Sequence, residues 1–226
     1  MITFDQQLKL FKLIGNTLKS RAECYVIGGS AMMFYDAKAE TLDIDLVFMD
    51  KKDLDNVKEA LISIGFELKS SLIKIFKRYD TASNTPIMMV RKDERFDLFV
   101  KEIISFVMSD TITKRVKETH EFDNLIVKVV SPEDIILMKC ATEREKDRYD
   151  ASNLIKKTNI NWDILIKERI HQAELTPYLF HVFLFDFLYE LKEDLKADIP
   201  KEVLNKIRKI SEDMLEKTLK KRSEKK

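Results

Sequence analysis

The chain of 226 residues contains only four glycines, and two of them, Gly28 and Gly29, stand side by side. Glycine is needed where the backbone takes a positive φ or where another group approaches it closely. The stretch from Tyr25 to Phe48 around this pair predicts an apolar strand, a tight turn, a short helix and a second strand. We expect the fold to be organised around this stretch.

Three aspartates lie on predicted strands close to this turn. Asp43 and Asp45 are two residues apart, so their side chains leave the same face of a strand, and Asp97 stands between apolar residues on a later strand. Aspartate is a poor strand residue, and carboxylates on one face repel each other unless a cation lies between them. The three acids together predict a Mg²⁺ site, suited to two ions and to phosphoryl transfer. For Asp43 and Asp45 alone, the alternative is a strand edge that ends in solvent with two incidental acids.

The segment Gly28-Gly29-Ser30 predicts a phosphate site. Because it lies between a strand and a helix start, its backbone N–H groups and the positive end of the helix dipole can hold a phosphate. The hydroxyl of Ser30 can cap the helix or bind the phosphate, and 12 residues separate it from Asp43. The alternative is a tight turn with an N-cap.

Apolar periodicity predicts the other elements of the first half. A capping box formed by Thr3 and Gln6 begins the first helix, which Gly15 weakens locally. The expected helices cover residues 4–20 and 54–64, and the expected strands are 24–27, 44–49, 72–79, 87–91, 95–100 and 125–130. Residues 103–117 fit no single pattern.

The character of the chain changes at Ser131. A capping serine, a proline in the first helical position and two acids follow one another from 131 to 134, which is a strong helix start. From there the pattern is helical almost to the end, with helices expected at 161–170, 178–191 and 201–220. The chain is therefore expected to form an α/β domain over 1–130 and a helical domain over 131–226.

Composition excludes several classes of protein. With 45% apolar residues the chain is not globally disordered, and 40 basic against 39 acidic residues argue against a protein that coats nucleic acid by bulk charge. Cys24 and Cys140 match no metal or redox spacing and are expected to be reduced core thiols. No apolar run reaches the ~20 residues of a membrane span, and the N-terminus lacks a signal-peptide pattern, so a cytoplasmic protein without membrane contact is expected.

The glycine turn, the Asp-Ile-Asp segment and the third strand aspartate together resemble the nucleotidyltransferase superfamily that includes DNA polymerase beta and the minimal nucleotidyltransferases. The later segment 132–150, with Lys139, Arg144, Asp147 and Asp150, is similar to AbiEii-type nucleotidyltransferases, which are known as abortive-infection toxins. The resemblance covers residues 23–157.

The resemblance implies an α+β fold, in which a small mixed β-sheet core with flanking helices precedes an all-helical half. It also implies roles: Gly28, Gly29, Ser30 and Lys139 bind the nucleotide, Asp43, Asp45 and Asp97 bind Mg²⁺ and catalyse, and Arg144, Asp147 and Asp150 position the acceptor, the nucleotide or Lys139. Asp97 would also help to deprotonate the attacking hydroxyl. For the helical residues, the alternative is a solvated charged face.

These expectations describe a Mg²⁺-dependent enzyme that transfers a nucleoside monophosphate from an NTP to a hydroxyl of RNA, a protein or a small molecule. The resemblance to AbiEii adds a toxin with an antitoxin partner. The alternative function is a non-catalytic module on the same fold that binds a nucleotide or a partner protein.

Overall fold

The computed structural model describes residues 1–69, 85–103, 106–142, 144–176 and 183–223, with side chains up to Glu216. The chain divides into two compact units, residues 1–131 and residues 132–226. The expected strand 72–79 lies outside the described residues. Within them, no helix combines the length and the apolar character needed to cross a membrane.

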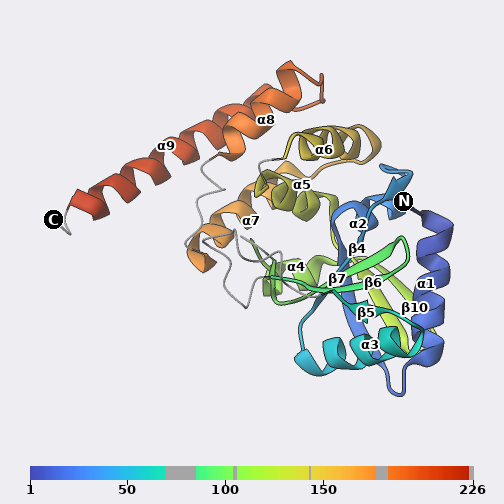
Figure 1. The fold of residues 1–226 in the computed structure, drawn as a ribbon. Helices are drawn as coiled ribbons and strands as arrows, with labels where there is room; N and C mark the ends of the chain where they lie inside the picture. The colour runs from blue at the N-terminus through green and yellow to red at the C-terminus, as the bar shows by residue number, and fades with distance from the viewer. Residues whose placement is uncertain (70–84, 104–105, 143, 177–182, 224–226) are drawn as a thin grey trace. The chain divides into compact units, whose positions relative to one another are not determined.

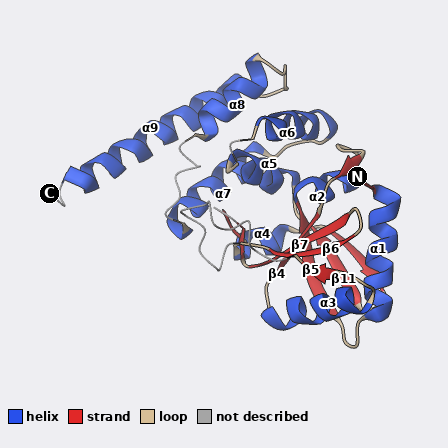
Figure 2. Ribbon diagram, in the orientation of Figure 1, coloured by secondary structure: helices blue, strands red, loops and turns tan. Residues whose placement is uncertain are grey.

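A seven-stranded mixed sheet forms the centre of the first unit (Figures 1 and 2), with the strand order β10-β11-β2-β4-β7-β6-β5. Its strands are β2 (Ala22–Ile27), β4 (Ile44–Phe48), β5 (Glu67–Leu68), β6 (Ile87–Arg91), β7 (Glu94–Val100), β10 (Glu118–Phe122) and β11 (Leu125–Val129). The neighbours β11/β2 and β4/β7 are parallel, and the other neighbours are antiparallel. This arrangement confirms the expected α+β class with a mixed sheet.

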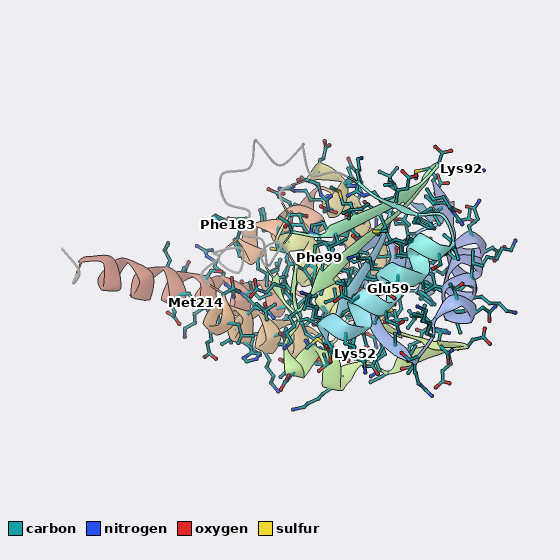
Figure 3. The ribbon with its side chains drawn as sticks, turned by 60° about the horizontal axis from the view of Figure 1, so that its bottom comes forward. Lys52, Glu59, Lys92, Phe99, Phe183 and Met214 are labelled. Carbon is teal, nitrogen blue, oxygen red and sulfur yellow. The ribbon has the colours of Figure 1, made fainter. Side chains whose placement is uncertain are left out.

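Among the described residues of the first unit, four helices accompany the sheet: α1 (Phe4–Thr17), α2 (Gly28–Phe34), α3 (Lys51–Ser63) and α4 (Asp110–Arg115). The capping box of Thr3 and Gln6 is present at the start of α1, as predicted. Both α1 and α3 pack against the sheet and contact each other. Figure 3 shows Lys52 and Glu59 on α3, and both side chains are exposed to solvent.

Two expectations about the opening stretch need correction. The helix α2 begins at Gly28 itself, so the predicted turn is reduced to one residue with a φ of +60°. The strand β4 begins at Ile44, which places Asp43 immediately before the strand rather than within it.

The residues between 102 and 115, for which the sequence predicts no element, form β8 (Glu102–Ile103), β9 (Phe106–Val107) and α4. The short strands β1 (Ile2–Thr3) and β3 (Glu40–Thr41) pair with each other in a separate two-stranded sheet.

The second unit is helical throughout its described residues. It contains α5 (Pro132–Cys140), α6 (Glu145–Lys157), α7 (Trp162–Leu175), α8 (Leu184–Glu193) and α9 (Lys201–Ser223). Pro132 is the first residue of α5, followed by the two acids, as the sequence predicts. The expected helix over 178–191 begins at Leu184 among the described residues. Cys24 and Cys140 are both buried and neither forms a disulfide bond, and burial raises the pKa of each thiol.

Gly15 has a different role from the one its helix position indicates. It lies where α1 crosses the hairpin of β10 and β11, and a Cβ at this position would be 1.7 Å from the backbone carbonyl oxygen of Phe122. The Asn124 side chain donates a hydrogen bond to the carbonyl of Leu18, just after α1, which fastens the helix to the same turn. The missing side chain therefore permits a close contact between two backbones.

Gly15→Ala is expected to destabilise the first unit by about 3 kcal/mol, because a backbone carbonyl cannot move aside as a flexible side chain can. Urea unfolding followed by circular dichroism measures the change. The matched control is Asn16→Ala, which adds the same residue at the next, exposed position of α1 and should not lower stability. An equal effect of the two substitutions would contradict the close-contact explanation.

Candidate active site

The three predicted acids meet at two neighbouring interior strands of the sheet, β4 and β7. Asp45 on β4 and Asp97 on β7 are direct partners in the parallel register of these strands. Asp43 precedes β4, and one carboxylate oxygen from each of the three residues lies within 4.8 Å of the others. Two neighbouring strands and the residue before one of them therefore bring three carboxylates to one place.

The strands hold these acids rigidly. Ile44, Leu46 and Phe96 alternate with the aspartates and have no exposed surface, so they anchor both strands in the core. Asp97 is itself only 5% exposed, whereas Asp43 and Asp45 are partly exposed. The cluster thus has a buried side and an accessible side.

Gly28 allows the carboxylate of Asp45 to approach the start of α2. Its φ of +60° is a conformation that side-chain-bearing residues rarely adopt, and a Cβ would lie 2.6 Å from Oδ2 of Asp45. At Gly29, a Cβ would lie 2.7 Å from Oγ1 of Thr41. The two glycines therefore let the start of α2 pack directly onto the segment that carries the first two acids.

Ser30 connects α2 to the same segment. Its fully buried hydroxyl donates a hydrogen bond to the carbonyl oxygen of Asp43 over 3.0 Å. Its own carbonyl accepts a hydrogen bond from Nε2 of Gln7 on α1. The structure thus shows Ser30 fixing the position of Asp43, and a contact of its hydroxyl with phosphate stays a prediction.

Arg95 is the prominent residue of the site that the sequence does not single out. Its Nε donates to Oδ1 of Asp97 over 2.7 Å and its Nη2 to Oδ2 over 2.5 Å, so that the guanidinium grips both carboxylate oxygens. Its Nη1 lies 3.8 Å from Oδ2 of Asp43. The sequence does contain a signal for this contact, because Arg95 is two residues before Asp97 on the same strand and so shares its face of the sheet.

The electrostatics of Asp97 combine opposing effects. Burial raises the pKa of its carboxyl group, and the hydrogen bonds and positive charge of Arg95 act against this rise. The negative charge of Asp43 raises the pKa further, and the positive charge of the exposed Lys69 lowers it. The net shift is upward, so Asp97 is a stronger base than an ordinary aspartate.

Three of the four predicted helical residues, Lys139, Asp147 and Asp150, form a buried cluster in the second unit, whereas Arg144 is exposed. Nζ of Lys139 on α5 donates to Oδ1 of Asp147 over 2.6 Å and to Oδ2 of Asp150 over 2.7 Å, both on α6. Nε of Arg144 and the hydroxyl of Thr142 donate to the other oxygen of Asp147. Asp147 is completely buried and Asp150 is 8% exposed. This burial does not fit the alternative of a solvated charged face.

Within this cluster, burial alone would raise the pKa of Asp147. The charge and hydrogen bond of Lys139, with the hydrogen bonds from Thr142 and Arg144, outweigh burial and hold the pKa below its usual value. Asp147 is therefore held as a carboxylate that joins α5 to α6. A contact of Lys139 with a nucleotide stays a prediction, as do positioning roles for Arg144, Asp147 and Asp150 toward a substrate.

A mixed sheet that presents three clustered carboxylates, two from adjoining strands and one from the residue before β4, defines an α+β protein with a candidate metal site. The chain belongs to the family described as nucleotidyltransferase of unknown function (DUF6036), whose model matches residues 1–180. This match confirms the predicted superfamily. It does not extend to the AbiEii type, so the toxin role and an antitoxin partner stay predictions.

Among solved structures, an antigenic nucleotidyltransferase-like protein from Paracoccidioides brasiliensis is 16% identical to this chain. That match covers 90% of this chain and 98% of the fungal one, with a TM-score of 0.41. A search of curated proteins found no match.

Proposed function

We propose that the chain is a Mg²⁺-dependent nucleotidyltransferase that transfers a nucleoside monophosphate from an NTP to a hydroxyl group and releases pyrophosphate. The observation that carries this proposal is the cluster of Asp43, Asp45 and Asp97, with carboxylate oxygens within 4.8 Å of one another. Membership of the nucleotidyltransferase family supports it independently.

The donor set fits magnesium. Three carboxylates supply hard oxygen ligands, and Mg²⁺ prefers one or a few carboxylates together with water and substrate phosphates. Asp43 and Asp45 on the accessible side, with Asp97 behind them, are the residues proposed to hold the ion or ions. When bound, the metal would neutralise the phosphate charge and stabilise the leaving oxygen.

In the proposed reaction the hydroxyl oxygen of the acceptor forms a bond to the α-phosphorus. The bond from the α-phosphorus to the oxygen that bridges to the β-phosphate breaks, and its electron pair leaves with pyrophosphate. The acceptor proton passes to Asp97, which we propose as the general base. The partly exposed Gly28 at the start of α2 is the proposed place for the phosphates.

Labelled nucleotides test this proposal. The protein is incubated with each NTP labelled at the α-phosphate, with Mg²⁺, and with RNA, protein or small hydroxyl compounds as acceptors. We expect label transfer and pyrophosphate release that EDTA abolishes. The matched control is the same NTP labelled at the γ-phosphate, from which no label should be transferred. Transfer from the γ-position, or transfer unaffected by EDTA, would overturn the proposal.

The alternative is a binding module without turnover, and one observation favours it. The bidentate contact of Arg95 neutralises Asp97 without a metal ion, so the acids have a protein counter-charge. Calorimetry separates the two functions. A module of this kind would bind an NTP equally well with and without Mg²⁺ and would transfer no label, whereas the enzyme should bind NTP more tightly with the metal.

A further inference from the structure

Arg95 contacts the same carboxylate of Asp97 that a metal ion held by the three acids would contact. Both oxygens of this carboxylate already accept hydrogen bonds from one guanidinium group, and the third nitrogen of that group points to Asp43 at 3.8 Å. A divalent cation ligated by the three acids must take at least one oxygen from this same region. Two positive groups in contact with one buried carboxylate would repel each other strongly.

We propose that Arg95 is an exchangeable counter-ion of the acid cluster. It neutralises Asp97 in the metal-free protein, and its guanidinium leaves Asp97 when a divalent cation binds. The released guanidinium then binds the phosphates of the nucleotide that accompanies the metal. The last step rests on the proposed function, whereas the exchange between Arg95 and the metal does not.

The position of Arg95 is suited to such a movement. Its backbone is held in β7, where it pairs with Val90 of β6, so the strand need not change when the side chain moves. The side chain is 35% exposed, in contrast to the 7% of Asp97, and so it has an open path to solvent. A guanidinium is also the group best shaped to exchange a carboxylate for a phosphate, since both accept its paired N–H donors.

Calorimetry with metal alone tests the exchange. Arg95→Met should bind Mg²⁺ or Mn²⁺ about tenfold more tightly than the unaltered protein, because the competing cation is gone. The matched control is Lys69→Met, which removes a positive charge that acts on Asp97 without a hydrogen bond to it. This control should change metal affinity by less than about threefold. Unchanged or weaker metal binding by Arg95→Met would overturn the exchange.

For nucleotide binding, the expected effect of Arg95→Met is the opposite of its effect on metal binding. With Mg²⁺ and a non-hydrolysable NTP, Arg95→Met should bind the nucleotide about tenfold more weakly, because a phosphate partner is lost. Equal nucleotide affinity would overturn this step. If metal binding tightens while neither protein binds nucleotide, the exchange stands and the proposed function fails. If the protein transfers nucleotides but metal affinity does not change, the function stands and the exchange fails.

A measurement on the unaltered protein covers the case in which Arg95→Met does not fold. The Nε–H signal of Arg95 is followed by NMR during a Mg²⁺ titration and is assigned by its loss in Arg95→Lys. We expect the signal to move and its exchange with water to accelerate as the guanidinium leaves Asp97. A signal that stays unchanged at saturating Mg²⁺ would contradict the proposal.

Discussion

Asp45→Asn is expected to lower nucleotide transfer by about a thousandfold or more while leaving the protein folded. Asp45 is the central acid of the cluster, because it pairs with Asp97 across the sheet and faces the start of α2 beside Gly28. Asparagine has nearly the same shape, so packing is conserved, but it lacks the negative charge that binds the cation. The loss of a group that stabilises developing charge typically costs 10²–10³ in rate, and a metal ligand lies at the upper end.

Stability separates this effect from unfolding. Because one of three mutually repelling carboxylates becomes neutral, the thermal midpoint of Asp45→Asn should stay the same or rise. The control is Asp93→Asn, an identical chemical change at an exposed residue beside Lys92 in the turn between β6 and β7 (Figure 3), which should keep full activity. Transfer by Asp45→Asn within threefold of the unaltered protein would exclude the proposed metal site.

The parts of the fold that follow a long pattern could be predicted from the sequence. The apolar stripe and capping box predicted α1, and Pro132 with its two acids predicted the start of α5. The strand β6 was predicted with its observed bounds, Ile87–Arg91. In each of these elements several neighbouring residues favour the same secondary structure, so the local sequence pattern agrees with the packing of the folded chain.

Other elements are too polar or too short for their sequence pattern to predict them. The strand β10 has the sequence Glu-Thr-His-Glu-Phe on the edge of the sheet, where one side is solvated and polar residues are tolerated. The two-residue strands β1 and β3 are shorter than any period that could reveal them. They form because a partner strand is near, which is a property of the folded chain.

Some residues of the candidate site could likewise be predicted from the sequence, and others could not. Spacing predicted that the side chains of Asp43 and Asp45 lie close together, although Asp43 precedes the strand instead of lying within it. Asp97 was recognisable as an acid isolated in an apolar strand. The role of Arg95 could not be recognised from the sequence, because a single arginine in a strand is common. Only the fold shows that its guanidinium hydrogen-bonds to the carboxylate of Asp97. The packing role of Gly15 could not be predicted for a related reason: its cost to helix propensity is local, and the carbonyl of Phe122 that requires it is more than a hundred residues away.

Lys139→Met should destabilise the second unit by about 3–5 kcal/mol. The substitution keeps most of the apolar stem but leaves Asp147 and Asp150 buried without the ammonium that holds both of them. Loss of one partner from a buried ion pair is costly because an uncompensated charge remains in the interior. Trp162 on α7 is the only tryptophan of the chain and lies in this unit, so its fluorescence during urea unfolding reports the change. Lys146→Met, at an exposed position of α6, is the matched control and should change stability by less than about 0.5 kcal/mol.

The pH dependence of the stability loss in Lys139→Met tests whether an uncompensated buried charge causes it. In the unaltered protein the pKa of Asp147 is lowered, so its contribution to stability is present above the pKa of the unfolded chain and is lost as the pH falls through the folded value. Without Lys139, burial raises that pKa, and protonation at low pH relieves the penalty. The difference in unfolding free energy between the two proteins should therefore shrink from pH 7 to pH 4. A further change of Asp147 and Asp150 to asparagine should restore part of the loss at pH 7. A deficit that is constant with pH and unaffected by these asparagines would show that lost packing, and not buried charge, accounts for the role of Lys139.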